Sequence, residues 1–156
     1  MSALQCRFVE RTDEGLTLLS QALDDFYFDR FGDAYLDYRT HNSLNELAGA
    51  AMLYDAETPC GCCGWKPLDE TTAELKRVYV RPAYRKQGAA RQLVEAIETQ
   101  VRQLGYTRTV LETARETPEA VAFYERIGYR TLPEGFGPYV GDSNCVCLEK
   151  TLCAAE

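Results

Sequence analysis

The sequence predicts an α+β or α/β fold with a mixed sheet, and two residue patterns indicate this class. Alternating residues predict a strand at 5–12, and segments separated by turn-prone residues predict a meander of three strands at 46–55, 59–67 and 72–80. Further strands are predicted at 107–113, 129–133 and 145–152. Apolar residues spaced three and four apart predict helices at 13–28, 90–104 and 117–127. A strand, helix, strand, helix, strand order through the centre implies right-handed crossovers on a mixed sheet.

Size and charge limit the classes of protein to consider. The chain has 156 residues, 46% of them hydrophobic, enough for one sizeable core, so we expect a single domain over residues 1–156. A formal net charge of -7 argues against nucleic acid or a membrane surface as partner and suits a cationic partner better. No apolar run reaches the ~18 residues of a membrane span, and the first residues lack a signal-peptide core. We therefore expect a cytoplasmic protein.

The first helix has both a start signal and an apolar face. Asp13 is placed to cap it, and Leu16, Leu19, Leu23 and Phe26 line one side. Residues 29–45 are polar and aromatic, which fits either a short second helix or an active-site loop.

Seven cysteines raise the question of a metal or disulfide framework. Their "CGCC" and "CVC" spacings place alternate thiols on one face of a strand and do not match the paired spacings of zinc sites. Free, mostly buried thiols in a reducing compartment are the favoured interpretation, with oxidation or metal binding as the alternatives.

The segment "RKQGAA", residues 85–90, loses its side-chain bulk just before a helix. Main-chain N–H groups at a helix start have no internal partner, so a phosphate could rest on Gly88, Ala89 and Ala90 beside the charges of Arg85 and Lys86. A tight turn with close helix-to-strand packing would select the same small residues. The pattern is neither a P-loop nor a full dinucleotide-binding fingerprint.

The same segment resembles the phosphate-binding signature Q/R-x-x-G-x-G/A of the GNAT superfamily of N-acetyltransferases. "ELKRVYVRPAYRKQGAARQLVEAIE" and "PEAVAFYERIGYR" are similar to two further units of that family, and together they cover residues 74–130. The resemblance implies an α+β fold, with a mixed, mostly antiparallel central sheet flanked by about four helices. It also implies an N-acetyltransferase that uses acetyl-CoA as acetyl donor, and it is compatible with a homodimer.

The resemblance implies a cofactor site in which strand main chain pairs with the pantetheine arm and amides hold the pyrophosphate. The implied cofactor-binding residues are Val78, Tyr79, Val80, Arg85, Lys86, Gln87, Gly88, Ala89, Ala90 and Thr117. Two of them depart from the family pattern. Lys86 stands where glycine is frequent, and we expect it to tolerate the loop only with a negative φ. Thr117 stands where an asparagine often touches the cofactor.

Two residues are implied for proton transfer. Tyr124 occupies the family position whose hydroxyl faces the thioester sulfur, where it would act as general acid; without the resemblance it reads as a buried tyrosine beside Phe123. Glu74 lies eleven residues before Arg85, the spacing of a strand glutamate in the histone-modifying branch, and is the first candidate for the base. A solvated glutamate at a strand end explains Glu74 equally well. Glu112 or a chain of water molecules could replace it. No signal ties a cysteine to His41, so that pairing is set aside.

The acceptor site is expected around residues 24–31, "DDFYFDRF", and the later aromatic loop. Asp24, Asp25 and Asp29 could attract an ammonium group. For most of the acids and aromatics here, however, the favoured interpretation is a solvated helix face and core packing, respectively. The candidate pocket walls are Phe26, Tyr27, Phe31, Phe136 and Tyr139.

These observations favour direct transfer of an acetyl group to a primary amine of a small molecule or protein. A CoA-binding regulatory module without turnover is the contrasting hypothesis, and a nucleotide-binding module of another fold is a third.

Overall fold

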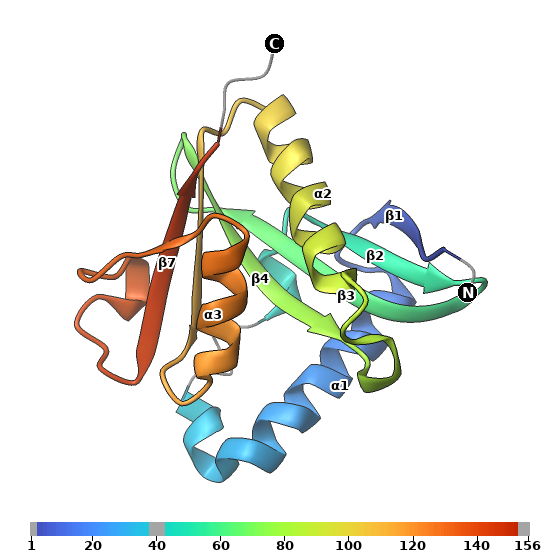
Figure 1. The fold of residues 1–156 in the computed structure, drawn as a ribbon, viewed down its shortest axis with the longest axis horizontal. Coiled ribbons are helices and arrows are strands. Elements are labelled where there is room, and N and C mark those ends of the chain that lie inside the picture. Colours follow the sequence, from blue (N-terminus) through green and yellow to red (C-terminus); the bar gives the residue numbers. More distant parts are fainter. Residues whose placement is uncertain (1–2, 38–42, 153–156) are drawn as a thin grey trace. The chain divides into compact units, whose positions relative to one another are not determined.

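The computed structural model describes residues 3–37 and 43–152, within which the chain forms seven strands and three α-helices (Figure 1). His41 and Cys153 lie outside the described residues. In chain order the elements are β1 (Gln5–Val9), α1 (Glu14–Phe31), η1 (Gly32–Asp37), η3 (Leu44–Glu46), β2 (Gly49–Asp55), β3 (Thr58–Pro67), β4 (Thr72–Val80), η4 (Pro82–Tyr84), α2 (Ala89–Gln103), β5 (Arg108–Ala114), α3 (Pro118–Arg126), β6 (Arg130–Thr131), η5 (Gly137–Tyr139) and β7 (Cys145–Thr151).

The strands form a mixed sheet with the order β1-β2-β3-β4-β5-β7-β6. The pairings of β1 with β2, β2 with β3, β5 with β7 and β6 with β7 are antiparallel. β4 and β5 are parallel. The mixed, mostly antiparallel sheet of the expected α+β fold is therefore confirmed. Where a further helix was expected, the described residues form the 3-10 turns η1 and η3.

Contacts within the chain group its residues into two compact units. The first contains the described residues up to Lys66 together with Leu75–Ile97, and the second contains Pro67–Glu74 and the described residues from Glu98 onward. β4 and α2 each contribute residues to both. The single domain expected over residues 1–156 stays a prediction.

In the first unit, α1 packs its apolar face onto β2 and β3. The Asp13 carboxylate accepts the Leu16 amide at 3.1 Å, which confirms the predicted cap. The core cluster consists of Leu16, Leu19, Leu47, Ala50, Met52 and Cys62. α1 continues to Phe31, three residues beyond the predicted end, and Gly32 with φ 60 ends it.

Helix α2 buries the face predicted for it. Leu93, Val94, Ile97 and Val101 are fully buried. Leu104, placed on that face by the sequence pattern, follows the end of α2 and is 62% exposed, so this part of the prediction is wrong.

In the second unit, β5 lies between β4 and β7, and Val110 and Leu148 are fully buried in the sheet. α3 ends before Gly128, whose φ of 104 requires glycine and turns the chain toward β6.

Most of the described cysteines lie inside the protein. Cys60, Cys62, Cys63, Cys145 and Cys147 are buried free thiols, as predicted, and Cys6 is half-buried. Across residues 3–37 and 43–152, no three His, Cys, Asp or Glu side chains gather as metal ligands. None of the helices in the described part of the chain has the length and apolar character of a membrane span.

Candidate active site

The predicted phosphate site lies in the first unit, where α2 begins. η4 follows β4, and a short loop then leads to Ala89, the first residue of α2. The Gln92 amide donates to the Gly88 carbonyl at 3.0 Å, the first hydrogen bond of the helical pattern. The amides of residues 88–91 precede that bond and have no partner within the helix, which makes them donors for an anion.

Gly88 shows why the loop lacks a large side chain just before α2 begins. Its φ is 80, and a Cβ built on it would meet nothing within 4 Å. The glycine is therefore required by its left-handed backbone and is not packed against protein, which leaves room for a ligand. Ala89, in contrast, is 4% exposed, so close packing does account for the small side chain there.

The expectation for Lys86 is wrong. Its φ is 65, in the left-handed region, although we expected the loop to tolerate lysine only at a negative φ. The turn forms with the side chain in place, at a conformational cost of roughly 1–2 kcal/mol for a residue with a Cβ.

Arg85 connects the loop to β4 and to α1. Its Nε donates to the Val80 carbonyl at 2.8 Å, and its guanidinium lies 5.8 Å from the ring centroids of Phe26 and Tyr79. Main-chain pairing of a cofactor arm at Val80 would therefore share the carbonyl with Arg85, which its second lone pair permits. Gln87 in the same loop is exposed.

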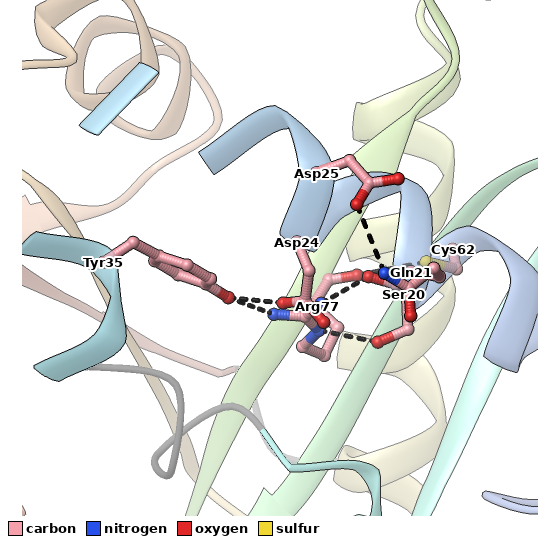
Figure 2. A network of polar contacts seen from close by, with 7 residues as sticks. All are labelled: Ser20, Gln21, Asp24, Asp25, Tyr35, Cys62 and Arg77. Atoms are coloured by element: carbon pink, nitrogen blue, oxygen red, sulfur yellow. Dashed lines mark hydrogen bonds and ion pairs between the residues drawn. The ribbon is translucent and has the colours of Figure 1, made fainter. Parts of the chain in front are cut away.

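A buried arginine on β4 lies at the centre of a polar network in the first unit (Figure 2). Arg77 donates to the Ser20 hydroxyl and carbonyl at 3.0 and 2.6 Å, to Asp24 at 2.8 Å and to the Tyr35 hydroxyl at 3.2 Å. Burial opposes its charge, but the Asp24 carboxylate and the Tyr35 hydroxyl leave the pKa of Arg77 above its ordinary value. The guanidinium is therefore charged and bonded within this network.

The aromatic acceptor candidates on α1 pack against one another. Tyr27 stacks with Phe31 at 6.0 Å between ring centroids and lies 5.7 Å from Phe26 and 5.1 Å from Tyr35. These rings are half-buried, except for the buried Tyr35. Asp24 is an ion-pair partner of Arg77, so its first role is structural.

The second unit brings together both candidate bases and one aromatic candidate. Glu74 pairs in register with Val110, two residues before Glu112, so both carboxylates project from the same face of the sheet. Tyr139 is 3% exposed, and burial together with the nearby charges of Glu112 and Glu74 raises the pKa of its hydroxyl. Tyr139 is therefore a neutral phenol at physiological pH. Phe136, also buried, packs edge-on against it at 5.4 Å.

A cavity of about 290 Å³ lies beside Tyr139 in this unit. Its wall includes Arg115, Leu132, Asp142, Cys145 and Cys147. Arg115 donates to the carbonyls of Ser143 and Cys145 at 2.8 and 3.3 Å, which joins two segments of the cavity wall.

Tyr124 and Thr117 come from α3 in the second unit. Tyr124 is 7% exposed, and its ring meets those of Phe123 and Tyr129 edge-on at 5.0 and 5.7 Å. Thr117 occupies the N-cap position, as predicted, but its hydroxyl makes no capping bond. The hydroxyl donates instead to the Ala114 carbonyl at 2.7 Å.

Sequence reasoning missed Arg77 and Tyr35. A signal for Arg77 existed, because a charged residue inside a buried strand requires a partner. The identity of that partner, Asp24, could not be read from a separation of 53 residues.

The sequence profile of the Acetyltransferase (GNAT) family matches residues 16–129, and the chain belongs to this family of acetyl-CoA-dependent N-acyltransferases. The uncharacterized N-acetyltransferase YjgM of Escherichia coli is 28% identical over 80% of this chain and 69% of its own length. An uncharacterized N-acetyltransferase of Schizosaccharomyces pombe is 31% identical over 72% of this chain and 79% of its own length. The chain spans only about half of several other curated relatives, such as 45% of a probable N-acetyltransferase 14 of Xenopus tropicalis.

Solved structures agree with this assignment. A candidate acyl-CoA N-acyltransferase from Klebsiella pneumoniae superposes with a TM-score of 0.78 at 27% identity, covering 96% of this chain and 98% of that one. The PaiA N-acetyltransferase of Thermoplasma acidophilum, solved in complex with coenzyme A, shares the fold with a TM-score of 0.73 at 18% identity, covering 96% and 99% of the two chains.

Proposed function

We propose that this chain transfers an acetyl group from acetyl-CoA directly to a primary amine of a small molecule or a protein. The open start of α2 carries this proposal. At Gly88 a left-handed glycine faces empty space, and the main-chain amides that follow are not used by the helix. The residues present therefore fit a diphosphate group.

The cofactor would be held mainly by main chain of the first unit. Amides from Lys86 through Ala90 would bind the pyrophosphate, with the charges of Arg85 and Lys86 beside it. The amide of Arg85, which we also expected to bind there, donates instead to the Pro82 carbonyl at 3.3 Å. Main-chain groups of Val78, Tyr79 and Val80 would pair with the pantetheine arm. Thr117 is the cofactor-contact candidate of the second unit. Bound acetyl-CoA supplies an acyl thioester that a neutral amine can attack.

Glu74 would take the proton that the amine must lose. A carboxylate inside the protein can accept a proton directly or through a water molecule. Its position in β4, 4% exposed and on the same face as Glu112, supports this role. Glu112 and a water chain to solvent are the alternatives.

Tyr124 would return a proton to the departing CoA thiolate. The C–S bond breaks as the C–N bond forms, and the sulfur then needs one proton. The ring of Tyr124 is fixed between Phe123 and Tyr129, which supports a single orientation of its hydroxyl. No acyl-enzyme is required.

The acceptor would meet aromatic walls. Phe26, Tyr27 and Phe31 are the proposed aromatic walls in the first unit. Tyr139 is a separate candidate in the second unit. Asp24 is bonded to Arg77, so Asp25 and Asp29 would attract the ammonium group among the three predicted aspartates. Asp25 also accepts Nε2 of Gln21 at 3.2 Å. The cavity of about 290 Å³ beside Tyr139 supports a small amine or a single side chain as acceptor.

The charge and the thiols support two further parts of the proposal. A net charge of -7 disfavours nucleic acid and anionic membranes and favours a cationic acceptor. Buried free thiols suit a reducing, cytoplasmic location. Light scattering on the purified protein would separate a monomer from a homodimer.

Release of free CoA thiol in the presence of an amine panel tests the proposed function. We expect amine-dependent release, with an acetylated amine detected by mass spectrometry. A regulatory module would bind acetyl-CoA without any thiol release. Running the panel with several acyl-CoAs also identifies the acceptor and the preferred acyl chain.

A further inference from the structure

Arg77 is a left-handed residue inside a strand. Its φ is 58, whereas strand residues ordinarily lie near -120°. A residue with a Cβ adopts this conformation only where its surroundings hold it there. The contacts of Arg77 therefore determine the course of β4 at this point.

The side chain of Arg77 is held on α1 and on η1. Only 1% of the side chain is exposed, and Nε, Nη1 and Nη2 all donate, through four hydrogen bonds to Ser20, Asp24 and Tyr35 (Figure 2). The Tyr35 hydroxyl also donates to Oδ1 of Asp24, which closes the network. A lysine cannot reproduce this planar fork of donors.

The main chain of Arg77 is held by the neighbouring strand. Sγ of Cys62 on β3 donates to the Arg77 carbonyl at 3.2 Å. Burial raises the pKa of Cys62 to about 12, so the thiol keeps its proton and remains a donor. Both the side chain and the carbonyl of the left-handed residue are thus fixed.

The segment that follows Arg77 is the proposed cofactor strand. A change in one backbone dihedral redirects everything after it, here Val78, Tyr79 and Val80. The Val80 carbonyl in turn accepts Arg85 Nε at 2.8 Å, so the start of the phosphate loop depends on where Val80 lies. All of these residues belong to the first unit.

We propose that Arg77 is a positioning residue for the cofactor: bonded to Ser20, Asp24 and Tyr35, it fixes the main chain of Val78–Val80 and, through Arg85, the phosphate loop. This inference rests on the proposed function. The network also reaches the acceptor side, because the Tyr35 ring lies 5.1 Å from that of Tyr27. One network thus orders both the cofactor strand and the aromatic acceptor segment.

Calorimetric titration with coenzyme A tests the proposal without requiring activity. The Arg77→Lys variant keeps the positive charge but loses the planar set of guanidinium N–H donors. We expect it to bind coenzyme A at least about tenfold more weakly than the unmodified protein. Glu98→Gln is the matched control, since it breaks a buried network of the second unit and is expected to lower stability. If lost stability alone weakened binding, this control would lose affinity too; we expect it to stay within about twofold.

The outcomes separate the inference from the proposed function. A folded Arg77→Lys protein that binds coenzyme A as the unmodified protein does would overturn the positioning role only. If the unmodified protein does not bind coenzyme A, the proposed function fails and the inference fails with it. Should Arg77→Lys not fold, Tyr35→Phe decides, because it removes one hydroxyl from the network. We then expect about threefold weaker binding, and an unchanged affinity would contradict the role.

Discussion

The hydroxyl of Tyr129 donates to Oε2 of Glu98 at 2.7 Å in the interior of the second unit. The other carboxylate oxygen accepts Lys150 Nζ at 3.0 Å, and Lys150 also donates to the Ile127 carbonyl at 2.9 Å. The Tyr129 hydroxyl lies 2.8 Å from that of Thr109. Glu98 thus ties α2, the end of α3 and β7 together, and it supports the ring against which Tyr124 packs.

Glu98→Gln should destabilise the protein by about 1–3 kcal/mol, because Lys150 loses its ion-pair partner in a largely buried place. Glu95→Gln is the control, since the same substitution on the same helix removes a partner of the exposed Arg91. We expect the control to change the free energy of unfolding by no more than about 0.5 kcal/mol. Urea unfolding of both variants measures the difference, and equal effects would contradict the role of the network.

Because the pKa of the Cys62 thiol is raised, we expect the protein to lose stability at alkaline pH. Burial raises its pKa from 9.0 to about 12, so folding favours the protonated thiol. The stabilisation is complete below the unfolded pKa near 9 and is lost as the pH rises toward 12. In that window this one group should lower the free energy of unfolding by about 1.4 kcal/mol per pH unit.

Unfolding of unmodified protein and Cys62→Ser, measured with a reductant at several pH values from neutral to alkaline, tests this slope. The serine variant lacks the ionisable thiol and should decline less steeply with pH. Parallel curves would show that Cys62 does not titrate in this way.

Tyr124→Phe should lower turnover by about 10 to 100-fold, at the lower edge of general-acid effects. Acetyl-CoA affinity should change little, because the ring and its packing against Tyr129 are retained. Steady-state kinetics with the best amine of the panel measures this, with Tyr54→Phe on β2 as the control. Normal turnover with chemistry rate-limiting would remove Tyr124 from the mechanism.

Glu74→Gln should flatten the alkaline rise in rate, because the amide cannot accept the amine proton. Glu112→Gln, on the same face of the sheet, is the matched comparison. If only the second variant changes the pH–rate profile, Glu112 is the base. An unchanged profile in both would assign proton removal to water.

Much of the fold could be predicted from local patterns. The face of α2 through Leu93, Val94 and Ile97 follows from helical spacing, and the Asp13 cap follows from side-chain chemistry within one turn. The bounds of β4 were also predicted correctly from the local sequence pattern. The end of α1 was missed because Gly32 was not read as a stop signal.

Backbone conformation at single residues could not be predicted. Lys86 and Arg77 both take positive φ values, and no local pattern marks a lysine or an arginine as left-handed. The Thr117 hydroxyl bonds to Ala114 because α3 follows β5 closely, a relationship that side-chain preference alone does not reveal. These are effects of tertiary contacts.

The sequence identified individual candidate residues of the site, but it did not show which of them lie close together. Glu74, Glu112 and Tyr139 were named separately, and only the sheet register places the two carboxylates on one face. The proposed roles of these residues remain predictions.

The central claim is that the diphosphate of acetyl-CoA rests on the amides after Gly88, and one calorimetric titration tests it most directly. Gly88→Asn keeps the left-handed backbone accessible but puts a side chain into the open space. Gly105→Asn makes the same change just beyond the other end of α2, where φ is 103 and the space is also open. We expect Gly88→Asn to weaken acetyl-CoA binding at least about tenfold and Gly105→Asn to leave it unchanged. Equal affinities in both variants and the unmodified protein would contradict the claim.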